Sequence, residues 1–332
     1  MLIRVHSRPF AAILFSLLTG CARYADFVLP PPDSSGPRAP FVWEASPKPI
    51  LTTGDWDSVD VLNPSVVRFR GQYLNLYSAY DGKTWVTALA DSPDGLTWQK
   101  RGRIITPTGA EGSYIAANGS ALAAGDEIFY WYETGDPFYI ALARSNDGIR
   151  WTKLGAVLGR GPLGSFDERS VADPYVIRAG EQFYMFYLGM DRARRQRIGV
   201  ARSSDGTHWE KLRANPILEL GAPGAFDEIG LGEPAVWSSG GSYWMLYTGR
   251  DRGERRKIVL ASSPDGVHWE RDLRFPPIAG SEPWNREVMC DPAVEVTPQG
   301  VRVWFGGGDV ARPDQNLHGQ IGVGMLKTAG MK

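Results

Sequence analysis

The chain has 332 residues and a formal net charge of -1, which argues against bulk electrostatic binding to nucleic acid or to an acidic surface. A hydrophobic content of 43% is enough for a sizeable core, and 12 Trp, 13 Tyr and 39 Gly are typical of an aromatic, turn-rich β protein. Length alone allows one large domain or two small ones.

Residues 1–20 are predicted to be a signal peptide. Arg4 and Arg8 precede a short apolar run, and the segment ends in Leu-Thr-Gly before Cys21. This order is that of a secretory signal, and the apolar run is too short for a stable membrane anchor. The ending resembles a bacterial lipoprotein signal, which implies cleavage before Cys21 and lipid on its sulfur. The alternative is an ordinary signal that happens to contain a cysteine.

The segment 21–40 is predicted to be the lipidated cysteine followed by a proline-rich tether. Pro30, Pro31 and Pro32 precede a polar stretch that ends at Pro37. The chain has only two cysteines, so lipid on Cys21 would leave Cys290 without a disulfide partner. The fold must then depend on its core alone.

A turn motif recurs four times along the rest of the chain. It has the form Ser-x-Asp-Gly-x-x-Trp and ends at Trp98, Trp151, Trp209 and Trp269, with steps of 53, 58 and 60 residues. Asp-Gly between two strand-like runs indicates a hairpin, because Gly accepts a positive φ and Asp bonds to its own backbone. These residues are interpreted as structural. They resemble the Asp-box turns of sialidases, although the spacing is one residue shorter.

A second motif has the same period and opens five apolar runs. It begins at Asn63, Asn118, Asp173, Glu233 and Asp291, with steps of 55, 55, 60 and 58 residues. A Gly turn and an aromatic strand follow each run. Four antiparallel strands repeated about every 55 residues are the pattern of a β-propeller blade. The sequence therefore predicts an all-β, five-bladed β-propeller over residues 41–332.

Five inner strands but only four Asp-Gly-Trp turns leave one outer strand to be found. The stretch from Val42 to Leu51 matches the stretch from Trp209 to Leu218, and Trp43 lies 55 residues before Trp98. We therefore expect residues 41–51 to complete the last blade, near Ile321–Leu326. Closure of the ring by both termini would leave fewer open sheet edges.

The five residues that open the inner strands should meet at one end of the central channel. Three of them are acids, Asp173, Glu233 and Asp291, and crowded carboxylates cost desolvation and repel one another. Such crowding separates pKa values, as acid and base catalysis requires. The alternative is that these residues only begin strands.

This frame resembles glycoside hydrolase families 43 and 32. The resemblance covers nearly all of the mature chain and implies that Asp173 tunes pKa and orients the substrate, while Glu233 is the general acid. The first blade departs from the pattern, because Asn63 replaces the Asp that serves as general base. Asn-Pro at this place is more similar to family 130, which includes phosphorylases, but that family's acidic second-blade motif is replaced here by Asn118. Asp291 is the best-placed substitute for the base, with Asp57 and Asp60 as alternatives.

The loops before the channel positions repeat as well. Aromatic residues precede four of the positions by seven residues, and polar residues precede them by five. Aromatic side chains can stack on sugar rings, and acids and Arg can bind sugar hydroxyls. Substrate contacts are therefore predicted for Trp56, Trp284, Glu168, Glu228, Arg286 and the nearby Arg169, in addition to Asn63 and Asn118. An equally good interpretation is that the aromatics seal adjacent blades.

Other chemistry is sparse. The four His residues form no zinc motif, so no metal site is predicted, although a channel ion such as calcium is compatible with the acids. No phosphate-binding loop is present. Cys290 reads as a buried filler, because no His is placed to activate it.

These observations predict a monomeric, lipid-anchored protein of the cell envelope, without a cofactor, that cleaves a glycosidic bond of an oligo- or polysaccharide. The alternatives are a carbohydrate-binding propeller without catalysis, which Asn63 favours, a glycoside phosphorylase, and a scaffold with a polar channel.

Overall fold

The computed structural model describes residues 23–330. The predicted signal peptide and Cys21 lie outside this range. Within it the protein is all-β apart from one short 3-10 turn, η1 (Gly109–Glu111). No helix among the described residues is long and apolar enough to cross a membrane.

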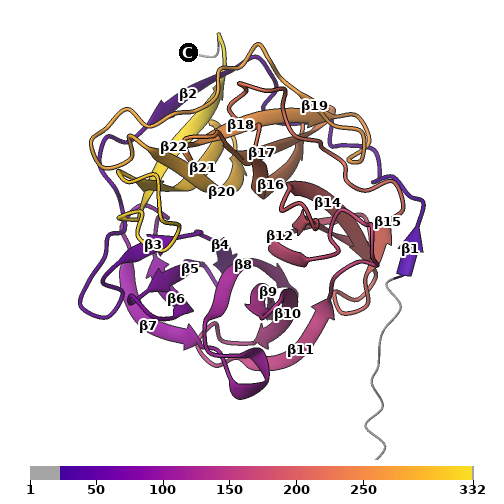
Figure 1. Cartoon of the computed structure of the whole chain (residues 1–332). Helices are drawn as coiled ribbons and strands as arrows, with labels where there is room; N and C mark the ends of the chain where they lie inside the picture. Colours follow the sequence, from indigo (N-terminus) through magenta and orange to yellow (C-terminus); the bar gives the residue numbers. More distant parts are fainter. Residues whose placement is uncertain (1–22, 331–332) are drawn as a thin grey trace, which may run out of the picture.

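Most strands belong to five consecutive antiparallel groups arranged around a common centre (Figure 1). Group 1 contains β3 (Asp60–Leu62), β4 (Val66–Phe69), β5 (Gln72–Tyr80), β6 (Trp85–Ser92) and β7 (Gln99–Ile105). Group 2 contains β8 (Ile115–Ala124), β9 (Glu127–Gly135), β10 (Phe138–Ser145) and β11 (Thr152–Leu158). Group 3 contains β12 (Ser170–Ala179), β13 (Gln182–Met190), β14 (Gln196–Ser203) and β15 (Glu210–Leu212).

Group 4 contains β16 (Gly230–Ser239), β17 (Ser242–Arg250), β18 (Arg256–Ser263) and β19 (Glu270–Arg271). Group 5 contains β20 (Val288–Thr297), β21 (Gly300–Gly308), β22 (Gln320–Thr328) and the N-terminal β2 (Phe41–Ala45). β2 pairs antiparallel with β22, with Trp43 opposite Leu326, and Leu51 makes an isolated bridge to Ile321. The first and last parts of the chain therefore share one sheet (Figure 1).

The Asp-Gly turns follow the chemistry expected from sequence. In the first, the Ser92 hydroxyl accepts the Gly95 N–H at 2.8 Å, and Asp94 Oδ1 accepts the N–H groups of Leu96 and Thr97, both at 2.8 Å. The same bonds recur in the other three turns. Gly95 has a φ of 75°, which glycine adopts without steric cost.

The core lies between neighbouring groups. Trp131 of β9 is fully buried and donates its indole N–H to Gly206, in the turn of the next group, at 2.8 Å. Trp304 of β21 donates to Gly95 of the first group in the same way, also at 2.8 Å. These two Trp side chains thus connect their own sheets to the adjacent ones.

Residues 23–40, predicted as a tether, follow the surface of the protein. β1 (Arg23–Ala25) pairs parallel with β15, and Leu29 is buried. The Tyr243 hydroxyl donates to Pro30 at 2.8 Å, and the Ser239 hydroxyl donates to Pro37 at 2.7 Å. The segment passes along the outside of the groups from β1 to β2 (Figure 1).

Candidate functional site: a ring of carboxylates

A β-bulge in each inner strand builds the site. The five residues predicted at the channel all have positive φ values, from 45° at Asp173 to 52° at Asp291. The strand register shifts at the same place in β8, β12, β16 and β20, and β3 and β4 are separated there. Left-handed backbone costs about 1–3 kcal/mol at a non-glycine residue, and such strain gathers at functional sites.

The bulges turn five side chains into one cavity of about 330 Å³. Its lining includes all of the predicted channel residues, namely Asn63, Asn118, Asp173, Glu233 and Asp291. Groups far apart in the sequence therefore contribute to a single pocket.

Asp291 and Glu233 form one close pair in this pocket. The Asp291 N–H lies 3.4 Å from Glu233 Oε2 and 3.1 Å from the Thr248 hydroxyl. One ligand atom each from Glu233, Cys290 and Asp291 lies within 4.8 Å of the other two. Burial and then the charge of Glu233 raise the pKa of Asp291 well above its ordinary value.

Asp173 forms a second pair with Glu133, a residue that sequence analysis missed. Glu133 lies on β9, is 4% exposed and lines the same pocket. Its Oε2 accepts the Asn118 side-chain amide at 3.2 Å. Burial is the main cause that raises the pKa of Glu133 to about 7. Burial and then the charges of Glu133 and Glu233 raise the pKa of Asp173 well above its ordinary value.

A buried arginine completes the wall of the pocket. Arg256 is 6% exposed, pairs with Asp314 and lines the cavity together with Arg250. Asp314 belongs to the connection between β21 and β22. Its neighbour Gln315 donates to the hydroxyl of Tyr114, before β8, at 3.1 Å. The pocket thus holds several acids close to a fixed cation.

The predicted approach-loop aromatics pack against other side chains. Trp284 stacks on Phe305 at a centroid distance of 5.9 Å and donates its indole N–H to Pro47 at 3.0 Å. Trp56 packs against the cluster that contains Leu51. Neither Trp is among the residues that line the central cavity. Their positions match the interpretation that these aromatics seal neighbouring sheets.

The polar approach residues also lie outside the central cavity. Glu168 accepts the Gly164 N–H at 2.8 Å, and Glu228 accepts the Gly224 N–H at 2.9 Å, so both carboxylates order their own loops. Arg169 and Glu228 line a neighbouring hollow of about 760 Å³, which shares residues with the central cavity. Arg286 is exposed.

The two alternative bases have structural contacts. Asp57 is fully buried, accepts the Tyr77 hydroxyl at 3.2 Å and pairs with Lys100. Asp60 accepts the N–H groups of Leu317 and Gly319 at 3.0 and 2.7 Å. The contacts of Asp57 recur at Asp167 and Asp227, which indicates a repeated structural network.

Calcium does not fit the close group of ligand atoms. Calcium prefers six to eight oxygen ligands, whereas this group offers two carboxylates and the Cys290 thiol. Asp291 Oδ2 already accepts the Asn63 N–H and the Cys290 thiol, both at 3.1 Å.

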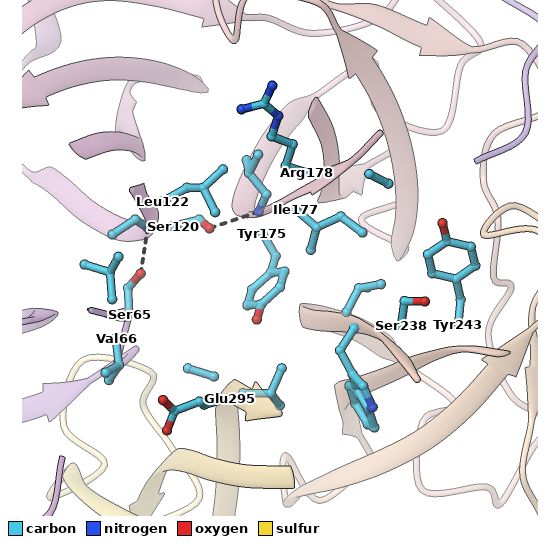
Figure 2. A pocket seen from close by; sticks show the side chains of 18 of the residues that line it. Ser65, Val66, Ser120, Leu122, Tyr175, Ile177, Arg178, Ser238, Tyr243 and Glu295 are labelled. Carbon is cyan, nitrogen blue, oxygen red and sulfur yellow. Dashed lines mark hydrogen bonds between the residues drawn. The ribbon is translucent and has the colours of Figure 1, made fainter. Parts of the chain in front are cut away.

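A second cavity of about 760 Å³ lies where the inner strands end. Its lining is largely apolar and includes Pro30 and Pro31 of the N-terminal segment. The Tyr175 side chain lies in this cavity (Figure 2), and its hydroxyl contacts the backbone of Val294. Asp33 and Glu295 are the acids that line it, and none of the acids of the central pocket does.

The chain matches the glycosyl hydrolases family 32 N-terminal domain over residues 66–217 and again over residues 141–289. It is also 30% identical over 240 residues to an uncharacterised protein of Mycobacterium tuberculosis, covering 63% of this chain and 75% of that protein.

Three solved structures illustrate the similarity in fold. A glycosyl hydrolase from Bacteroides ovatus has a TM-score of 0.71 and 14% identity, covering 90% of this chain and 98% of that one. A β-1,2-mannobiose phosphorylase from Listeria innocua has a TM-score of 0.68 and 12% identity, with coverages of 86% and 96%. A family 117 glycoside hydrolase from Zobellia galactanivorans has a TM-score of 0.65 and 15% identity, with coverages of 88% and 92%.

The fold and its neighbours define a β-propeller of the glycoside hydrolase type. The two family matches together span residues 66–289, more than half of the chain. The chain therefore belongs to the glycosyl hydrolases family 32 N-terminal domain family, as its repeats and acidic inner-strand positions had suggested.

Proposed function

We propose that the protein is an enzyme that cleaves glycosidic bonds, with Glu233 as the proton donor. The observation that carries this proposal is one pocket whose lining includes five acids, Glu133, Asp173, Glu233, Asp291 and the Arg256-paired Asp314, where strained backbone turns three of them inward. Packing alone gives no reason to gather these carboxyl groups, since each pays a desolvation cost.

Asp173 and Asp291 have supporting roles in this proposal. Asp173 lies among Glu133, Glu233 and Asp291, and burial together with these charges raises its pKa, which favours the protonated, hydrogen-bond-donating form. The Asp291–Glu233 pair is too close for an inverting mechanism, which needs about 6.5–9.5 Å between its two carboxyl groups. Asp291 is therefore better suited to orienting Glu233 than to activating water opposite it.

The lead alternative is a carbohydrate-binding propeller, which is favoured by Asn63 at the first inner-strand position. A screen of the purified protein on a glycan panel, with and without phosphate, separates these functions. Release of reducing sugar without phosphate supports hydrolysis, and release that needs phosphate supports a phosphorylase. Binding without release supports the binding module.

We further infer that the five strand groups are the blades of one ring closed by β2, and that the protein acts in the cell envelope as a lipid-anchored monomer. The β2–β22 pairing supports the first inference. The sequence before Cys21 supports the second.

A further inference from the structure

A second ring of five positions lies behind the first. It contains the residue 15 positions after each channel residue, namely Ser78, Glu133, Leu188, Thr248 and Gly306. Each pairs with the residue just before the channel position of its own group, so the five positions are structurally equivalent. Glu133 is the one ionisable member of this second ring.

The polar residues of this second ring accept the backbone N–H of the channel residue in the following group, and this role needs no charge. The Ser78 hydroxyl accepts the Asn118 N–H at 2.9 Å, and the Thr248 hydroxyl accepts the Asp291 N–H at 3.1 Å. Glu133 accepts the Asp173 N–H in the same manner. Since a hydroxyl performs this task in groups 1 and 4, the buried negative charge in group 2 is surplus to it. A surplus buried carboxylate that lines a pocket of acids calls for a chemical role.

We propose that Glu133 is the general base of the reaction, in place of the acid that Asn63 does not provide; this inference rests on the proposed function. The Glu133 carboxylate removes a proton from a water molecule as that oxygen bonds to the anomeric carbon. The glycosidic C–O bond breaks, and its oxygen takes the proton of Glu233. One water is consumed, and the two carboxyl groups then exchange protons with solvent.

The neighbours of Glu133 suit this role. Glu133 belongs to group 2 and Glu233 to group 4, so they approach the pocket on either side of Asp173. Hydrogen bonds from the Asn118 amide and then from Asp173 lower the pKa of Glu133 and favour its ionised form. Burial and the charge of Glu233 raise the pKa of Glu133 and oppose its ionisation. The charges of Asp291 and Arg256 act on the pKa of the neighbouring Asp173. Together they leave the pKa of Glu133 at about 7, where a base is effective.

The test uses the full-length protein and the sugar that the glycan panel identifies, supplied as an oligosaccharide and as its 2,4-dinitrophenyl glycoside. Glu133→Gln keeps the shape of the side chain, and Glu133→Thr copies Thr248. We expect both variants to lose about 10²–10⁴-fold in kcat on both substrates, because a base is needed whatever the leaving group. Glu233→Gln should lose far more kcat on the oligosaccharide than on the dinitrophenyl glycoside, because dinitrophenolate leaves without needing a proton.

Three further readouts distinguish a base from a structural residue. The acid limb of the pH profile near 7 should disappear in Glu133→Gln, azide should partly restore Glu133→Thr, and the wild-type product should have inverted configuration by NMR. Glu111→Gln is the matched control, because Glu111 is a buried carboxylate of the same region that contacts Tyr132 and Lys153 away from the pocket. It should keep the acid limb.

Wild-type rates in both Glu133 variants, or a product of retained configuration, would overturn the role of Glu133 and leave the proposed function intact. A wild-type protein that cleaves no member of the panel would overturn the proposed function, and the base with it.

Discussion

At the scale of single residues, burial decides what each carboxylate can do. Glu133 and Asp173 lose most of their hydration in the central pocket, whereas Asp94 is exposed in a surface turn and is held by backbone N–H groups. The first environment favours the protonated acid and the second favours the carboxylate. The two classes therefore respond to pH in opposite directions.

Glu133 should make the protein less stable as the pH rises. Its pKa is about 7 in the folded protein and 4.5 in the unfolded chain. Its stabilising effect is therefore complete below pH 4.5 and is lost as the pH rises through about 7. The shift corresponds to about 3 kcal/mol. Urea denaturation of wild type and Glu133→Gln from pH 4 to 8 measures this. A difference between the two proteins that does not change with pH would contradict it.

Asp94 should act in the reverse sense. The N–H groups of Thr97 and then Leu96 lower its pKa to about 2. Its contribution is therefore present above about pH 4 and is lost as the pH falls through 2. Wild type should be more stable than Asp94→Asn at pH 6, and the gap should narrow below pH 4. An equal gap at pH 6 and pH 2.5 in chemical denaturation would refute this.

At the scale of elements, β2 is the strand on which closure depends. It pairs with β22, and Trp43 contacts Phe305 edge-on at 5.8 Å. Removal of residues 1–51 should cost several kcal/mol, since truncation of one buried aromatic side chain such as Phe41 alone costs about 3–5 kcal/mol. At about 2–4 °C per kcal/mol, Tm should fall by about 10 °C or more in scanning calorimetry. A variant that begins at residue 41 is the control for β2, and an unchanged Tm in the shorter variant would disprove the role of closure.

The elements also show why prediction from sequence succeeded unevenly. The Asp-Gly turns and the five channel positions were predictable, because their chemistry is local and repeats. Glu133 was not singled out, since its importance depends on register across neighbouring strands. Its signal was present, however, as an acid in an aromatic strand where the equivalent positions hold Ser, Leu, Thr and Gly. The packing of Leu29 and Pro30 against groups 3 and 4 had no such signal.

At the scale of the whole molecule, the packed N-terminal segment bears on the proposed lipid anchor. β1 begins at Arg23, two residues after Cys21, so an anchor at Cys21 would hold group 3 within about 7 Å of chain length from the lipid.

Cys21→Ser should convert a detergent-partitioning protein into one that remains in the aqueous phase, because acyl chains supply the membrane affinity. Phase separation of the two proteins, expressed with their signal sequence in a bacterial host, measures this. The same partitioning of both forms would contradict a lipid anchor at Cys21.

In the proposed reaction, the carboxylate pocket cleaves glycosidic bonds with Glu233 as the acid. The most direct test compares wild type and Glu233→Gln on one oligosaccharide, measuring kcat by product release and affinity by calorimetry. Amide and acid have similar shapes, but only the acid donates a proton. We expect kcat to fall by at least about 10²-fold in Glu233→Gln while Kd changes little. Wild-type turnover by Glu233→Gln, or sugar binding without turnover by the wild type, would contradict it.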